Sequence, residues 1–237
     1  MARTSAAQRR ARADLWLWAG ALCVGAWGLL YPLPYGLCMS VQIGGAVAFL
    51  ALPFVRPKRF PLLKKNGTLG TAAQIATIFV FILTIRSLLD FNLIDWSEPL
   101  APAVAAGLLL AGLARAAGRH IDPPPRRANV HASMTGLLFM GLGLGWGATV
   151  EVNVLLDRST LAIHRLTVER KWVSGGRYAR DHLQLVPRIE ALGGTDFRVE
   201  PHVWRRAAIG AAACVEERPG LLGIRWYQVT LCGEPGA

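Results

Sequence analysis

Residues 69–89, LGTAAQIATIFVFILTIRSLL, hold a single charged side chain, Arg86, in an otherwise apolar run. At about 1.5 Å per residue, a helix over this stretch reaches about 30 Å, the thickness of the hydrocarbon layer of a membrane. Further apolar stretches of similar length lie at residues 15–31, 37–55, 100–117 and 132–152. The sequence therefore predicts a membrane α-helical bundle of five transmembrane helices.

The composition also favours a membrane protein. Of 237 residues, 53% are hydrophobic and only 17% are charged, whereas ordinary soluble domains have about 45–50% apolar and about 25% charged residues. The mean hydropathy is +0.35. With 4 cysteines and 25 glycines that follow no period, disulfide-dense small proteins and collagens are excluded as classes.

Charged side chains sort among the segments that connect the apolar stretches. The segments before the first stretch, after the second and after the fourth are rich in Lys and Arg, whereas the segment after the third holds Asp90, Asp95 and Glu98 and no basic residue. By the positive-inside rule, the N-terminus and the basic segments are cytoplasmic, and the acidic loop lies outside. The net charge of +11 is therefore a topology signal, and nucleic acid is not expected as a partner. The expected partner of the helices is the lipid bilayer.

Residues 157–237 are predicted to form a separate extracytoplasmic domain after a transmembrane domain of residues 1–156. Polar and apolar residues alternate over 161–174, and Gly175 and Gly176 then favour a turn. Further strand patterns occupy residues 180–186, 196–203, 213–217 and 224–231, with a helical turn around 204–209. Five short strands with glycines at the corners predict a small all-β, barrel-like domain of the OB or SH3-like kind.

Several blocks of the chain resemble a family of uncharacterised bacterial multi-pass membrane proteins. These blocks are NVLLDRS at 153–159, KWVS at 171–174, PGLLGIRWY at 219–227 and LLDFNLIDW at 88–96. The resemblance implies an inner-membrane protein of a bacterial cell, with helices followed by a small C-terminal β domain in the periplasm. It implies no activity.

The cysteines fall into two groups. Cys214 and Cys232 lie on the two C-terminal strands, in a compartment that permits disulfides, so they form either a disulfide or two buried thiols. A disulfide there is worth about 2–4 kcal/mol. Cys23 and Cys38 lie in the first two apolar stretches, and the chain has no CxxC pair, which argues against a thiol oxidase.

Polar side chains near the outer ends of the stretches form the second group of candidates. Arg86 and Asp90 are spaced i, i+4 and so face one side of a helix, as a possible intramembrane polar pair. An ionisable residue in a membrane span is a functional hypothesis. The alternative is that Arg86 extends to the headgroups and pairs with Asp90 there. Glu151 is expected to mark the point where the fifth helix leaves the lipid.

Glycines mark a helix-packing face in the fifth stretch. Gly141, Gly143, Gly145 and Gly147 form two overlapping GxxxG frames, which let helices approach closely in lipid. Packing within the chain is expected, with a partner's helix or a homodimer as the alternative.

The acidic loop offers a docking site for the β domain. We expect residues 90–98 to attract basic side chains of that domain, among Arg158, Arg165, Arg177 and Arg180. Loop and domain would then form one platform for a partner.

No motif in the sequence indicates catalysis. The chain has no P-loop, dinucleotide fingerprint, GxSxG or HExxH, and its 5 histidines match no metal spacing. No catalytic residue, cofactor or metal is therefore predicted. The sequence favours a non-catalytic accessory protein whose β domain binds another membrane or envelope protein or an envelope component. The alternatives are a small transporter or channel component, and a membrane enzyme that acts on a lipid-soluble substrate.

Overall fold

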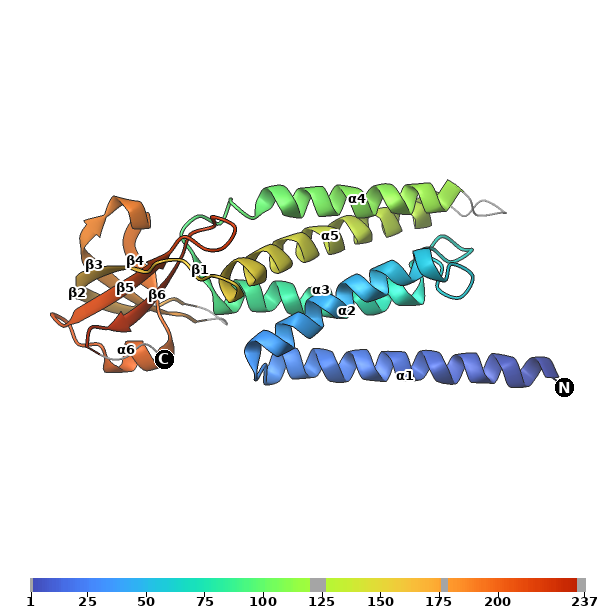
Figure 1. Cartoon of the computed structure of the whole chain (residues 1–237), viewed down its shortest axis with the longest axis horizontal. Helices are drawn as coiled ribbons and strands as arrows, with labels where there is room; N and C mark the ends of the chain where they lie inside the picture. Colours follow the sequence, from blue (N-terminus) through green and yellow to red (C-terminus); the bar gives the residue numbers. More distant parts are fainter. Residues whose placement is uncertain (1, 120–126, 176–178, 234–237) are drawn as a thin grey trace. The chain divides into compact units, whose positions relative to one another are not determined.

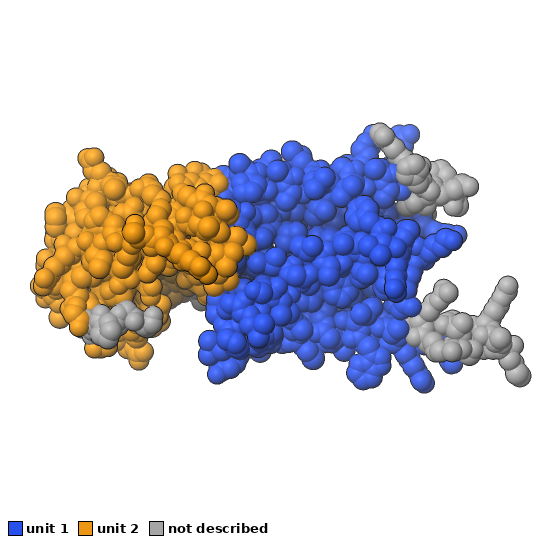
Figure 2. Space-filling model, viewed as in Figure 1, with its two compact units in different colours: residues 1–89, 99–151 blue, residues 90–98, 152–237 orange. Residues whose placement is uncertain are grey.

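The computed structural model describes residues 2–119, 127–175 and 179–233 (Figure 1). Sequence predictions that involve Arg126, Gly176 and Arg177 lie outside the described residues. The chain divides into two compact units (Figure 2): residues 1–89 with 99–151, and residues 90–98 with 152–237. The chain therefore passes from one unit to the other after Leu89, before Pro99 and after Glu151.

The first unit consists of helices. Their bounds are α1 (Ala2–Leu30), α2 (Tyr35–Val55), α3 (Thr71–Asp90), α4 (Leu100–Arg119) and α5 (Arg127–Leu155). Each of these five contains a stretch long and apolar enough to cross a membrane. The five predicted helices are thus confirmed. An apolar segment in lipid forms a helix because a helix satisfies all of its backbone hydrogen bonds within the segment.

Helix α3 is the most buried of the candidate spans, with 50% of its apolar window buried. Small residues of its neighbours allow the close approach. A Cβ placed on Gly25 of α1 would lie 2.8 Å from Ile78, and one on Gly45 of α2 would lie 2.7 Å from Phe79. Packing inside this unit therefore depends on glycines, as expected where helices associate without a hydrophobic driving force from water.

The second unit contains a sheet in the order β1-β6-β5-β2-β3-β4, with all neighbours antiparallel. The strands are β1 (Asn92–Leu93), β2 (Ala162–Val173), β3 (Asp181–Ile189), β4 (Gly194–Arg198), β5 (Ala212–Arg218) and β6 (Trp226–Leu231). Alternate residues along β3 and β5 are buried, namely Leu183, Leu185, Ala213 and Val215. This period of two places one face of the sheet on a single apolar core.

The sheet curls into a nearly closed barrel. Strands β4 and β6 are not neighbours in the sheet, yet the rings of Phe197 and Tyr227 meet edge to face at 5.4 Å. The backbone N–H of Arg198 also donates to the Tyr227 hydroxyl at 3.3 Å. Burial raises the pKa of Tyr227, although this N–H and the Arg198 charge oppose the rise. Contact between distant strands is the property that distinguishes a curled sheet from a flat one.

Two elements differ from the sequence prediction. The predicted strand 196–203 is wrong in its second half, because Pro201 begins a short helix, α6 (Pro201–Arg206), directly after β4. Proline lacks a backbone N–H and suits the first turn of a helix. The sheet also has six strands instead of five, since residues 92–93 of the loop between α3 and α4 pair with β6 as β1.

Candidate functional site

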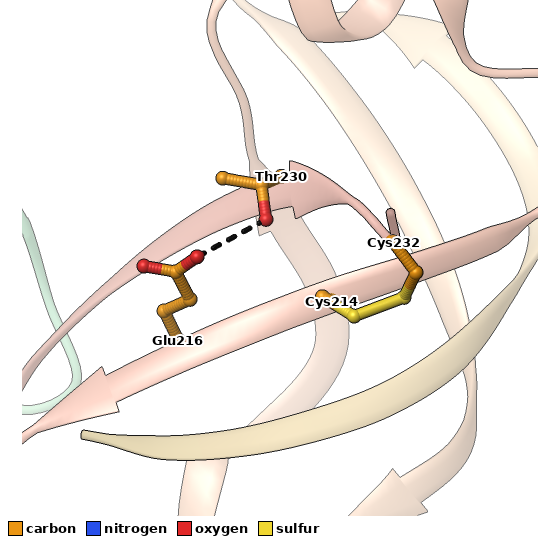
Figure 3. Close-up of a disulfide and its surroundings, with 4 residues drawn as sticks. All are labelled: Cys214, Glu216, Thr230 and Cys232. Atoms are coloured by element: carbon orange, nitrogen blue, oxygen red, sulfur yellow. Dashed lines mark hydrogen bonds between the residues drawn. A yellow bond between two sulfur atoms is a disulfide. The ribbon is translucent and has the colours of Figure 1, made fainter. Parts of the chain in front are cut away.

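A disulfide closes the end of the β5–β6 hairpin. Cys214 on β5 is bonded to Cys232, just after β6, with their Cα atoms 5.1 Å apart (Figure 3). On the same hairpin, the Thr230 hydroxyl donates to the Glu216 carboxylate at 3.2 Å (Figure 3). Of the two bonding states considered for these cysteines, the structure contains the bonded one. The bond lies in the sheet and has a structural role. Cys23 and Cys38 are free thiols.

Glu151 is fully buried within the protein. That it marks the point where the fifth helix leaves the lipid stays a prediction. Its carboxylate accepts a hydrogen bond from the hydroxyl of Tyr35 at 2.9 Å, across 116 residues of sequence. Glu151 is on α5 and Tyr35 begins α2. A buried carboxylate requires such partners, because burial of a charge without compensation is very costly.

The neighbourhood of Tyr35 includes the predicted intramembrane residue Arg86. The guanidinium of Arg86, on α3, lies 5.8 Å from the centre of the Tyr35 ring. Asp90, one turn further on α3, belongs to the second unit, where its charge acts on Arg198 of β4. The structure thus brings Arg86 to Tyr35 of α2, and the pair of Arg86 with Asp90 stays a prediction.

Gln42 is a further fully buried polar side chain of α2. Its amide nitrogen donates to the carbonyl oxygen of Val24 on α1 at 3.0 Å. The close fit depends on Gly28, since any Cβ there would collide with the Gln42 amide. This hydrogen bond joins the first two helices in a place where lipid cannot supply one.

Three of these polar residues, each from a different helix, form what we term the buried polar cluster: the half-buried Tyr35 of α2 and Arg86 of α3 and the fully buried Glu151 of α5. Chemically, the cluster offers a carboxylate, a phenol and a guanidinium. Among the described residues, no group of three or more His, Cys, Asp and Glu side chains could hold a metal ion. These side chains could exchange a proton or form hydrogen bonds. Their observed contacts join α2 to α5 and to α3.

The four predicted glycines of α5 pack on two different helices. A Cβ on Gly141 or Gly145 would lie 2.5 Å from the Ala106 carbonyl oxygen or 2.6 Å from the Ala103 Cα, both on α4. A Cβ on Gly143 or Gly147 would lie 2.7 Å from Thr84 or 2.8 Å from Leu83, both on α3. Each GxxxG frame therefore serves a separate helix of the same chain.

Asn153 organises the start of the second unit, a role that was not predicted from the sequence. This fully buried residue donates from Nδ2 to the Ile224 carbonyl oxygen at 2.8 Å. Its side-chain oxygen accepts the N–H of Leu222 at 2.8 Å, and its backbone oxygen accepts the N–H of Leu221 at 3.1 Å. The last turn of α5 is thereby bonded to the loop between β5 and β6. A lone Asn near the end of an apolar run is the only sequence signal for it.

The acidic loop joins the β domain mainly through its backbone. Besides the β1–β6 pairing, the N–H of Ile94 donates to the Arg225 carbonyl oxygen at 3.0 Å. The N–H of Arg225 in turn donates to the Glu98 carboxylate at 3.2 Å. Docking through Arg158, Arg165, Arg177 and Arg180 stays a prediction, and Arg177 lies outside the described residues. The pairing of β1 with β6 could not be predicted from the acidic residues of the loop, because it depends on backbone hydrogen bonds.

Carboxylates near this junction are held ionised. The backbone N–H and the hydroxyl of Ser97 bond to Asp95 and lower its pKa. Burial alone would raise the pKa of Asp157, but hydrogen bonds from Ser159 and from Trp226, whose Nε1 donates at 2.9 Å, outweigh it and lower the pKa. Both carboxylates therefore remain anionic at neutral pH.

The outer face of the sheet carries an aromatic and polar group on β2, β3 and β4. The rings of Trp172 and His182 stack at 4.2 Å, and His182 Nδ1 lies 3.2 Å from the Asp196 carboxylate. Gln184 donates to Glu169 at 2.7 Å. Because His182 and Gln184 alternate with the buried Leu183 and Leu185, they point away from the core. We term these residues the hairpin face: Glu169, Trp172, His182, Gln184 and Asp196.

Comparisons with protein-family models, with curated proteins and with solved structures gave no match.

Proposed function

We propose that this chain is a non-catalytic accessory protein of the bacterial inner membrane, whose β domain binds a protein partner in the periplasm. The basic and acidic segments support a cytoplasmic N-terminus and a periplasmic β domain. The Cys214–Cys232 disulfide agrees with that compartment, since disulfides persist where the environment is oxidising. The curled sheet agrees with an OB or SH3-like barrel, and with the resemblance to bacterial multi-pass membrane proteins.

The observation that carries the proposal is the pairing of β1 with β6, with Asn92 opposite Tyr227 and Leu93 opposite Trp226. This pairing makes the loop between α3 and α4 a strand of the β domain. The chain therefore enters or leaves the β domain at the ends of α3, α4 and α5, and not at the end of α5 alone. The partner-binding domain that we propose therefore includes residues 90–98 as well as residues 152–237.

The hairpin face is the surface that we assign to the partner. Trp172 and His182 form a rigid aromatic pair flanked by carboxylates and an amide. Aromatic residues are enriched at the centres of protein interfaces, and Trp is the most frequent residue whose loss is costly. We therefore expect the partner to present an aromatic side chain that packs on Trp172, or a basic side chain that pairs with the carboxylates of the hairpin face.

Site-specific photocrosslinking tests the proposal in native membranes. A benzophenone amino acid at Gln184 is expected to form one discrete adduct with a partner, whereas the same group at the exposed Glu200 forms none. In the Gln184 background, Trp172→Ala should reduce the adduct about tenfold or more, since a central Trp contributes about 2 kcal/mol or more. Equal adducts from both positions, or no adduct, would overturn the proposal.

The alternatives predict other outcomes of the same experiment. A polysaccharide or other envelope polymer would yield a broad smear in place of a discrete band. A transporter component or an enzyme acting on a lipid-soluble substrate would leave the hairpin face without adduct. In that case its activity would depend on the buried polar cluster, which contains the ionisable residues Tyr35, Arg86 and Glu151.

A further inference from the structure

Large apolar residues are partly exposed where α5 ends in the second unit. Between 36% and 57% of each side chain is exposed. We term this set the juxtamembrane patch: Trp96, Leu155, Leu156, Leu221 and Leu222. Such a group of leucines with a tryptophan is unusual on a surface that faces only water.

Hydrogen bonds to one residue hold the leucines together. Asn153 accepts the N–H groups of both Leu221 and Leu222. Leu155 and Leu156 follow Asn153 directly in the chain. The two pairs of leucines are therefore fixed near the same turn of α5.

The loop that carries Leu221 and Leu222 has a defined shape. Gly220 has a φ of 75°, a left-handed conformation that favours glycine, and a Cβ there would lie 2.5 Å from the Ile224 carbonyl oxygen. The same Ile224 oxygen accepts the amide of Asn153 at 2.8 Å. The loop is thus in close contact with Asn153, and hydrogen bonds hold Leu221 and Leu222 in place at its end.

Trp96 joins the patch through Arg225. Residues two positions before and two positions after Trp96 bind the backbone of Arg225. The N–H of Ile94 donates to the Arg225 carbonyl oxygen, and the Glu98 carboxylate accepts the Arg225 N–H. Arg225 follows Ile224, which Asn153 binds. The loop between α3 and α4 therefore brings a tryptophan to the same junction.

The position of Asn153 indicates what covers the patch. Asn153 lies in the last turn of α5, a helix long and apolar enough to cross a membrane. A residue at the end of such a helix lies at the boundary between hydrocarbon and headgroups. Tryptophan and leucine partition into this boundary, and arginines next to it interact with lipid phosphates. Arg158, two residues after Leu156, supplies such a cation.

We propose that the juxtamembrane patch inserts into the headgroup and upper acyl region of the leaflet in which α5 ends. Its partner is the lipid bilayer. The insertion removes five apolar side chains from water and fixes the β domain at the membrane surface. Burial of one leucine contributes about 1.5–3 kcal/mol, so even partial insertion of the patch is favourable. This inference is independent of any protein partner of the hairpin face.

Spin labelling of the full-length chain tests the proposal. In a Cys23→Ser, Cys38→Ser background, a nitroxide is attached to Leu222→Cys and, as a matched control, to Ile209→Cys. Ile209 is also apolar and is 71% exposed, but it lies just before β5, at the opposite end of that strand from the Leu222 loop. At about 3.3 Å per residue, the length of β5 separates them by about 20 Å.

The protein is placed in vesicles of equal parts phosphatidylcholine and phosphatidylglycerol, and collision rates with oxygen and with a water-soluble nickel chelate are compared. The ratio of oxygen to nickel collisions is expected to be severalfold higher at position 222 than at position 209, because oxygen concentrates in lipid. Equal, water-like ratios at both positions would overturn the proposal. A label at 222 that is immobile and inaccessible to both reagents would also overturn it, since protein would then cover the patch.

Discussion

Tyr35 and Glu151 show how a single hydrogen bond joins two helices inside the bundle. The Tyr35 hydroxyl is 2.9 Å from the carboxylate of the fully buried Glu151. We predict that Tyr35→Phe lowers the free energy of unfolding by about 1 kcal/mol, because polar interactions within membranes contribute about 0.6–1.7 kcal/mol. The measurement is unfolding of the purified protein in mixed micelles with increasing SDS.

Tyr31→Phe is the matched control for this prediction. Tyr31 lies between α1 and α2 and is largely exposed, so removal of its hydroxyl should leave the unfolding midpoint unchanged. Equal midpoints for the Tyr35 and Tyr31 variants would show that the buried hydrogen bond adds nothing to stability.

Single residues were predictable only where their function depended on local sequence. Two adjacent strand patterns at the end of the chain placed Cys214 near Cys232 but left open whether they are bonded, and the structure contains the bond. The burial of Glu151 was not predictable. An acidic residue near the end of an apolar run is compatible with exit from lipid, and its actual environment depends on Tyr35, which is 116 residues away. The role of Asn153 was not predictable for the same reason, because the residues that it bonds to lie about 70 positions later in the chain.

At the scale of elements, the glycines of α5 yield a prediction about packing against α4. Gly145→Ala would place a methyl group 2.6 Å from the Ala103 Cα, so the helix backbones must separate. We expect a loss of about 1–3 kcal/mol, as for other overpacked interiors, seen as a lower midpoint in the same SDS titration.

Gly112→Ala on α4 is the control, because nothing lies within 4 Å of a Cβ at that position. It should keep or slightly raise stability, since alanine favours helices by up to about 1 kcal/mol over glycine. If Gly145→Ala instead weakens self-association and leaves the midpoint unchanged, the glycines act between copies of the chain.

The helices were predictable because each one depends on its own composition. The expected stretch 100–117 and the candidate span Leu100–Ala117 coincide, as do 37–55 and Tyr35–Val55 within two residues. Strand β1 was beyond prediction, since two residues carry no periodicity and their pairing depends on β6, more than 130 positions later. A helical turn was predicted around 204–209, but α6 begins earlier, at Pro201, among residues whose apolar pattern resembled the end of a strand.

For the whole molecule, strand pairing imposes a rule on topology. If all five candidate spans cross a membrane, the loop between α3 and α4 and the C-terminal domain lie on one side of it, because β1 belongs to the same sheet as β2–β6. With the five spans found among the described residues, the N-terminus then lies on the other side. Under the same condition the basic loop between α2 and α3, which is separated from β1 by α3 alone, lies opposite the sheet.

Fusions of a reporter that is active only outside the cytoplasm test this rule and its direction. Truncation fusions after Trp96 and at the end of the chain should both be active, whereas a fusion after Lys65 should be silent, because the basic loop resists translocation. The opposite pattern would reverse the orientation and leave the fold intact. Different results for Trp96 and the C-terminal end would contradict the fold itself, since β1 and β6 could not then pair.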